Sequence, residues 1–167
     1  MKLVIRKLRE DEKVKDLLEY INELVREDVY ISTNKIMTYS EEKKWLKDTI
    51  KSIKRDDSIT LLAKTDGKIV GIASASRDTG RERENAGIGI SIRKGYRGKG
   101  FGKKLLSEIV VRAKKKLKPK NIYLYVYAPN KVAISLYKKL GFRVVAKLKY
   151  WGKHKGKYVD KMIMVLK

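Results

Sequence analysis

Residues 88–111 read IGISIRKGYRGKGFGKKLLSEIVV, and this stretch decides which fold the chain predicts. It begins with Ile88, Ile90 and Ile92 alternating with small residues, the period-two pattern of a β-strand. Its last part, continued to Leu117, has apolar residues at the spacing of an amphipathic helix that begins at Phe101. Between the two, residues 93–102 contain four glycines and four cations. This order predicts an anion site, because the first N–H groups of a helix lack internal partners and glycines let an anion approach the backbone.

Two common nucleotide-binding motifs are excluded in this turn. A Walker loop needs a glycine five residues before Gly102, where Arg97 stands, and a dinucleotide fingerprint from Gly98 needs a glycine at Lys103. The residues present, Arg97-Gly98-Lys99-Gly100-Phe101-Gly102, have the form R-G-x-G-x-G. This form resembles the pyrophosphate-binding motif of the GNAT superfamily, the acyl-CoA-dependent N-acyltransferases. The alternative is a solvated basic turn that happens to be rich in glycine.

A second segment carries the same resemblance. Residues 130–142, NKVAISLYKKLGF, closely resemble the family segment N-x-x-A-x-x-L-Y-x-x-x-G-F and follow the glycine turn by some 30 residues. Residues 66–71, DGKIVG, look like the hairpin that this family commonly carries before its central strand. Both segments stand in the family's order and register, so the chain is identified as a member of this superfamily over nearly its whole length.

The remaining patterns predict the rest of the fold. A proline stops the long helix at Pro119, Gly141 is placed to end the helix of residues 131–140, and Ser40 is a candidate N-cap. We expect an α/β (α+β) protein with the GNAT fold, in which about four helices flank a central mixed, mostly antiparallel sheet of about seven strands. We expect residues 1–167 to form a single domain. The expected strands are 3–8, 58–64, 68–76, 85–92, 122–127, 142–151 and 158–166, the expected helices are 11–28, 40–53, 101–117 and 131–140, and residues 152–156 form the last loop.

Composition restricts the function. The chain has no cysteine and one histidine, His154, so a disulfide, a thiolate metal site and a cysteine nucleophile are excluded, and we expect no metal. The net charge of +23 favours polyanions. The aromatic residues do not interleave with the basic clusters, so nucleic acid is expected only as a nonspecific electrostatic partner. The charged N-terminus MKLVIRKLRE lacks the apolar run of a signal peptide or membrane span, and we expect a cytoplasmic protein that is not bound to a membrane.

The resemblance implies acetyl-CoA as the acyl donor. Its pantetheine arm would pair with the backbone of the central strand, in an opening between that strand and residues 122–127. Its pyrophosphate would lie on the N–H groups of the glycine turn. Asn130 would bond the pantetheine from the far wall, unless it serves only as a helix N-cap. The implied cofactor-binding residues are Ile90, Ser91, Ile92, Arg97, Gly98, Lys99, Gly100, Phe101, Gly102 and Asn130.

The resemblance also implies direct attack of an amine on the thioester. Tyr137 matches the family tyrosine that protonates the departing thiolate; the alternative is a core aromatic residue. The identity of the general base stays open. Many relatives carry a glutamate in the central strand where this chain has Gly87, which leaves Glu84, or Tyr125 and Tyr127 acting through water. His154 is interpreted as an exposed bystander in a loop rich in glycine and lysine.

The acceptor is an amine, and a protein N-terminal α-amine or a lysine is preferred. An α-amine has a pKa of about 7.7–8.0, against about 10.4 for lysine, so it needs less help from a base. The acidic stripe on the first helix offers a surface for a basic protein, although a solvated helix face explains it more simply: Glu12, Asp16, Glu19, Glu23 and Glu27. The other hypotheses are a polyamine or antibiotic acetyltransferase, a non-catalytic acyl-CoA-binding protein, and a basic nucleic-acid-binding protein. The oligomeric state also stays open, and a homodimer is one possibility.

Overall fold

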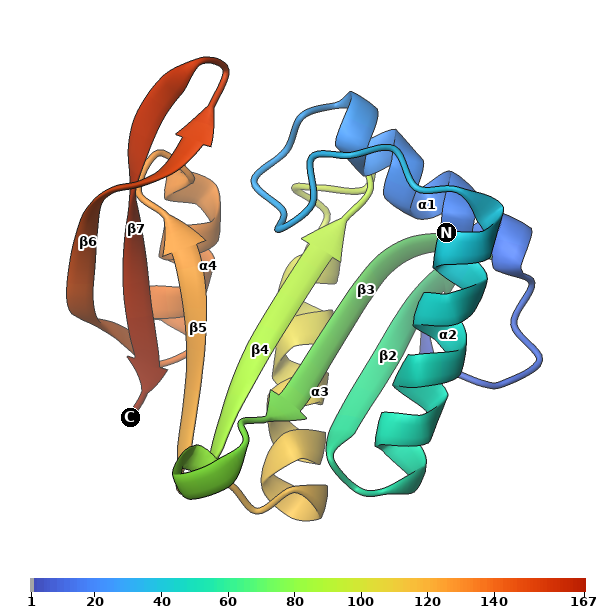
Figure 1. Ribbon diagram of the computed structural model, residues 1–167, viewed down its shortest axis with the longest axis horizontal. Helices are drawn as coiled ribbons and strands as arrows, with labels where there is room; N and C mark the ends of the chain where they lie inside the picture. The colour runs from blue at the N-terminus through green and yellow to red at the C-terminus, as the bar shows by residue number, and fades with distance from the viewer. Residues whose placement is uncertain (1) are drawn as a thin grey trace.

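The computed structural model describes residues 2–167, and its seven strands form one sheet in the order β1-β2-β3-β4-β5-β7-β6 (Figure 1). All neighbouring strands are antiparallel except β4 and β5, which are parallel. This arrangement confirms the predicted fold class. The strands are β1 (Val4–Lys7), β2 (Ser58–Thr65), β3 (Lys68–Arg77), β4 (Asn85–Ile92), β5 (Asn121–Tyr127), β6 (Phe142–His154) and β7 (Lys157–Leu166). The helices are α1 (Val14–Arg26), α2 (Tyr39–Lys54), α3 (Phe101–Lys116) and α4 (Lys131–Lys139), with a short 3-10 helix η1 (Gly80–Glu82) before β4.

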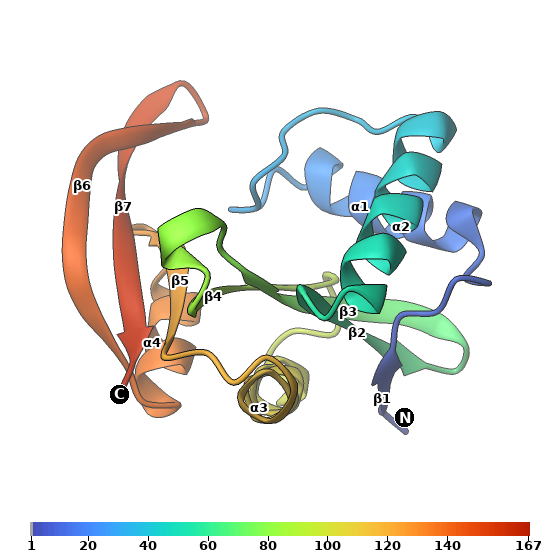
Figure 2. The same cartoon turned by 60° about the horizontal axis from the view of Figure 1, so that its bottom comes forward.

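Helices cover both faces of the sheet (Figure 2). Helices α1 and α2 lie on one face and α3 on the other. Each layer has its own apolar core, in which side chains such as Leu17 and Leu24 of α1, and Leu105 and Ile109 of α3, are fully buried. Tyr137 of α4 belongs to the α3 core. None of the helices in residues 2–167 is long and apolar enough to cross a membrane.

The pairing between β4 and β5 covers only the first part of both strands. The ladder joins Asn85 to Asn121 and ends at Gly87, opposite Tyr123. From Ile88 onward β4 stays paired with β3 on its other edge, while β5 follows β7. The two strands therefore separate towards the glycine turn, as Figure 1 shows, and one edge of the end of β4 has no neighbouring strand.

Two predicted boundaries were wrong. The N-cap of α2 is Thr38 rather than Ser40, because Thr38 has Glu41 three residues later and the two form a reciprocal capping box. The last hairpin has no loop at residues 152–156: β6 runs to His154 and β7 starts at Lys157, so that only Lys155 and Gly156 form the turn. Both have positive φ, 49° and 76°, which is the conformation that a tight two-residue hairpin turn requires.

Candidate functional site

The turn between β4 and α3 leaves a continuous row of backbone donors without partners. Gly95, Gly98 and Gly100 have φ values of 80°, 75° and 78°, in the left-handed region that side chains disfavour. A Cβ atom on any of these three residues would meet no heavy atom within 4 Å, so the backbone conformation rather than close packing requires glycine. The N–H groups of residues 97–103 donate to no backbone acceptor within residues 2–167. Such a row of convergent donors is suited to a phosphate or pyrophosphate group.

The electrostatics of the turn favour the same ligand. Helix α3 starts at Phe101, whose buried ring fixes the first turn against the core, and this turn carries no acidic residue. The helix dipole therefore adds partial positive charge that no carboxylate cancels. Lys99, Lys103 and Lys104 are exposed around it and are able to reach a bound anion.

The unpaired edge of β4 lies next to this turn. The carbonyl of Ser91 accepts a hydrogen bond of 3.0 Å from the Tyr20 hydroxyl of α1, and the carbonyl of Ile92 accepts one of 2.8 Å from Arg97 Nε. A carbonyl has a second lone pair. Ser91 forms a hydrogen-bonded pair with Ile72 in the β3–β4 ladder, so its carbonyl faces β3 and not the unpaired edge. The carbonyl of Ile92 faces the unpaired edge and keeps one acceptor position for a further donor, such as an amide of a pantetheine arm.

Two arginines near the turn are paired with the acidic stripe of α1. Arg97 uses its remaining nitrogens on the Glu27 carboxylate, with one bond of 2.9 Å. Arg93 is only 2% exposed; it contacts Glu23 and lies 3.1 Å from Glu19. The guanidinium group of Arg93 also lies 5.5 Å from the centre of the buried Tyr20 ring. Burial raises the pKa of Tyr20 to about 12, so its hydroxyl stays a donor at physiological pH.

The acidic stripe is therefore not a free acidic surface. Besides the three glutamates named above, Glu12 contacts Arg6 and lies 3.5 Å from Lys64. Within the described chain, Asp16 alone of the five has no ion pair. Cations of the same chain pair with four of the five carboxylates, so the stripe offers less free negative charge to a basic protein than the sequence suggested.

Helix α4 places Asn130 and Tyr137. Asn130 is the N-cap, and its Oδ1 accepts from the N–H of Ala133 at 3.2 Å; its Nδ2 donates to nothing in residues 2–167. Tyr137 is 7% exposed and its ring lies 6.0 Å from that of Phe142. The Tyr137 hydroxyl forms no hydrogen bond with any residue from 2 to 167. It is not fully buried, so it reaches solvent. Burial of the side chain raises the pKa of Tyr137 to about 12.

The structure does not bring Glu84 together with the other predicted site residues. Glu84 precedes β4, and its carbonyl accepts from Lys120 N–H at the closed end of the β4–β5 pair. It stands eight residues before Ile92, which is roughly 26 Å along an extended strand. On β4 itself the residues on the α1 side of the sheet are Asn85, Gly87, Gly89 and Ser91, since Ser91 bonds to Tyr20 and side chains alternate. None of these four is a carboxylate.

Sequence reasoning missed the pair formed by Tyr123 and Asp78. A Cβ atom on Gly87 would lie 3.2 Å from the Tyr123 ring, so that ring occupies the space that a side chain at Gly87 would fill. The Tyr123 hydroxyl donates to Asp78 Oδ1 at 2.7 Å, and burial together with this carboxylate raises its pKa. No local pattern signals the pair, because its members are 45 residues apart.

His154 is not an exposed bystander, so that interpretation was wrong. Its side chain is 15% exposed, and its Nδ1 lies 3.6 Å from Asp28 of the α1–α2 connection. Its ring centre lies 4.2 Å from that of Tyr30, which in turn is 5.8 Å from Tyr127 at the end of β5. The hairpin of β6 and β7 therefore contacts the α1–α2 connection beside the separated end of β5.

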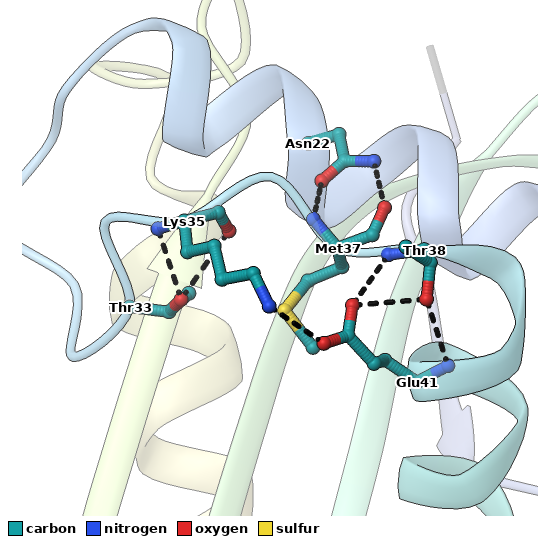
Figure 3. Close-up of polar contacts among 6 residues, drawn as sticks. All are labelled: Asn22, Thr33, Lys35, Met37, Thr38 and Glu41. Carbon is teal, nitrogen blue, oxygen red and sulfur yellow. Dashed lines mark hydrogen bonds and ion pairs between the residues drawn. The ribbon is translucent and has the colours of Figure 1, made fainter.

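The α1–α2 connection is fixed by local hydrogen bonds, which Figure 3 shows. Asn22 of α1 holds Met37 by both backbone groups, at 2.8 and 2.9 Å. Glu41 accepts from the Thr38 N–H at 2.8 Å and pairs with Lys35 at 2.9 Å. The C-terminal end of the segment that carries Tyr30 is thereby anchored to α1 and to the first turn of α2.

Comparison with known proteins gives one consistent result. The model of the acetyltransferase (GNAT) family matches residues 19–142. An uncharacterized N-acetyltransferase of Methanocaldococcus jannaschii is 32% identical over 118 residues, which are 68% of this chain and 52% of that protein. A GNAT-family acetyltransferase of Streptococcus pneumoniae has a TM-score of 0.86 at 28% identity, covering 98% of both chains. A ribosomal-protein-alanine N-acetyltransferase of Brucella melitensis has a TM-score of 0.83 at 25% identity, covering 97% of this chain and 98% of that chain.

A chain that has this fold, this glycine turn and a match over most of its length is a GNAT protein. It belongs to the acetyltransferase (GNAT) family. It covers 52% and 40% of the length of two curated relatives that it matches, so it spans about half their length or less.

Proposed function

We propose that this protein transfers an acetyl group from acetyl-CoA to an acceptor amine. The observation that carries the proposal is the row of free N–H groups of residues 97–103 beside the unpaired edge of β4. The N–H groups from Gly98 to Gly102 would hold the pyrophosphate, with Lys99 adding charge. Arg97 mainly holds the turn in place, because its guanidinium group is already paired with Glu27.

The remaining predicted residues line the path from the turn to the reacting group. The free acceptor position of Ile92 and the backbone of Ile90 would pair with the pantetheine arm, and Asn130 Nδ2 would donate to it from α4. The backbone of Ser91 lies between them and is paired with β3. Bound acetyl-CoA supplies an activated thioester, so this chain needs no nucleophile of its own.

Tyr137 holds the proton that the departing sulfur needs. A pKa of about 12 keeps its hydroxyl protonated at physiological pH. Against a thiol pKa of about 8.5, full transfer of that proton is unfavourable by roughly 5 kcal/mol, at 1.36 kcal/mol per unit. Tyr137 therefore acts as a hydrogen-bond donor to the sulfur while negative charge develops on the sulfur. The proton is transferred completely only where burial also raises the pKa of the CoA thiol.

For the acceptor we infer a protein or peptide N-terminal α-amine. The α1 side of β4 carries an asparagine, two glycines and a serine, so no strand carboxylate stands ready to deprotonate an amine. An α-amine, with its pKa of about 7.7–8.0, is partly neutral near pH 7.5 without such a base. The similar Brucella enzyme acetylates a ribosomal-protein alanine according to its name, which agrees with this class of acceptor. Six lysines in the β6–β7 hairpin, residues 147–161, disfavour a polyamine nearby.

The test measures the release of free thiol from acetyl-CoA with three acceptors. These are a peptide with a free N-terminus, its N-blocked twin that contains a lysine, and spermine. Transfer to the first peptide alone is the expected result. Transfer only to the blocked peptide or only to spermine would contradict the α-amine and leave the acetyltransferase standing. If CoA binds in a calorimeter and no amine in a broad panel releases thiol, the protein is a binding module and the proposed activity fails.

A further inference from the structure

The hairpin of residues 147–161, at the end of the sheet formed by β6 and β7, combines exposed aromatic side chains with a high positive charge. Tyr150, Trp151 and Tyr158 are 73%, 63% and 68% exposed. The same fifteen residues contain six lysines and one carboxylate, Asp160. Single exposed apolar residues are ordinary on a protein surface. Three exposed aromatic rings on one basic hairpin are not, and they contradict the prediction that aromatic and basic residues do not interleave.

A bulge in β6 presents two of these rings. The register passes from Leu148 opposite Lys161 to Gly152 opposite Val159, so three residues of β6 stand against Asp160 alone. Tyr150, within the bulge, has a φ of 54°, which is uncommon for a bulky residue and costs free energy.

Asp160 holds the bulge in this conformation. It accepts from the Tyr150 N–H at 3.0 Å and pairs with Lys147 at 2.9 Å. The strained backbone is therefore maintained by a dedicated contact, and the bulge contains the exposed Tyr150 and Trp151.

Exposed lysines stand beside these aromatic residues in the sequence of the hairpin. Lys153, Lys155 and Lys157 are all exposed and occupy the tip of the hairpin, and the Lys153 ammonium lies 6.0 Å from the centre of the Tyr158 ring. Flat aromatic faces next to cations are what a single-stranded nucleic acid requires, because its bases stack on the rings and its phosphates contact the lysines. A membrane would need an apolar tip, whereas Lys155 and Gly156 form the turn here.

We propose that the hairpin of residues 147–161 binds single-stranded nucleic acid. Trp151 and Tyr158 stack on bases, with Tyr150 beside them, and the tip lysines neutralise phosphates. The net charge of +23 supplies long-range attraction, and the rings add a preference for unstacked bases that charge alone does not give.

The protein carries its own reporter at this site. Its only tryptophans are Trp45 of α2 and Trp151, so a Trp45→Phe variant emits from Trp151 alone. Titration with a twelve-nucleotide uridine RNA at moderate salt is expected to quench this emission and to raise the anisotropy of labelled RNA. A duplex of equal length is expected to bind more weakly and to quench little.

Matched variants separate stacking from charge. Stacking contributes about 1–3 kcal/mol per base, so Trp151→Ala combined with Tyr158→Ala should weaken RNA binding at least about tenfold. Replacing Lys153, Lys155 and Lys157 by alanine should also weaken it and reduce its salt dependence. The control removes three exposed lysines of α2, Lys43, Lys47 and Lys51, and should change the affinity by less than about threefold.

Three results would overturn the proposal. Trp151 emission that stays constant at saturating RNA means that the rings do not stack. Equal affinity of the aromatic double variant and the parent, with circular dichroism showing that both are folded, leaves only nonspecific attraction by charge. Quenching by phosphatidylserine vesicles or by polyglutamate, but not by the RNA, assigns the hairpin to a membrane or to an acidic protein instead.

Discussion

Two glycines of the same turn should respond oppositely to the same substitution. Gly100 has a φ of 78°, and a Cβ there would point into open space. It would belong to the same turn as the free N–H groups of residues 97–103. Gly102 is the second residue of α3 and has no positive φ. A Cβ at Gly102 would point inward, 3.5 Å from Leu136 and 3.7 Å from Ile92, which is ordinary contact.

The magnitudes follow from backbone conformation. Alanine at Gly100 must adopt the left-handed region, at a cost of about 1–2 kcal/mol in folding free energy. Its methyl group also obstructs the approach of a phosphate. Loss of one charge-assisted hydrogen bond of about 1.5–3 kcal/mol corresponds to a CoA affinity lower by about tenfold to a hundredfold. Alanine at Gly102 gains about 0.5–1 kcal/mol because glycine is a poor residue in a helix, and it should leave CoA binding nearly unchanged.

The assay combines thermal unfolding with calorimetric titration of CoA. For a chain of this size, Gly100→Ala should lower Tm by about 3–6 °C, and Gly102→Ala should raise it by about 2–3 °C. The reasoning is refuted if Gly100→Ala binds CoA like the parent, or if Gly102→Ala loses affinity while its stability rises. The second result would mean that the ligand approaches from the Leu136 side, and not across the open side of the turn.

Three further predictions concern other parts of the molecule. Tyr137→Phe should lower turnover by about a hundredfold and change acetyl-CoA affinity by less than about threefold; an equal loss in both quantities would make Tyr137 a packing residue. Glu27→Gln removes a carboxylate beside the turn and releases Arg97, so CoA affinity should rise about threefold at low salt and much less at high salt; weaker binding would mean that Glu27 orients Arg97 for the ligand. Burial raises the pKa of Glu42 to about 6. The folded state binds the proton more tightly, so stability falls by about 2 kcal/mol as pH rises from about 4.5 to 6, and Glu42→Gln should raise Tm by about 5 °C at pH 7.5 and hardly at pH 4. An equal shift at both pH values would contradict this.

The sequence predicted the strands, helices and turns, because these depend mainly on residues that are close together in the chain. The alternation around Ile88 to Ile92 and the helical spacing after Phe101 led to β4 and α3, and the glycines led to the turn between them. It did not predict contacts between distant segments. Arg97 and Glu27 are 70 residues apart, and Tyr20 and Ser91 are 71 apart. Only the packing of α1 onto the end of β4 brings these groups together. The charge pattern of the sequence alone therefore made the acidic stripe on α1 look like a free surface.

Those long-range contacts explain how an unpaired strand edge is stabilised next to an anion site. Once β5 separates from β4, the carbonyl of Ile92 needs another donor, and Arg97 supplies it. Arg97 is balanced by Glu27, and the neighbouring Arg93 is balanced by Glu19 and Glu23, since a buried charge such as that of Arg93 would be costly without a partner. Because Arg93 and Arg97 are neutralised in this way, their charge adds little to the attraction for a phosphate. The attraction must come mainly from the free N–H groups of residues 97–103, from the dipole of α3 and from the exposed lysines around the turn. The site is therefore positive chiefly because of how the glycines arrange the backbone.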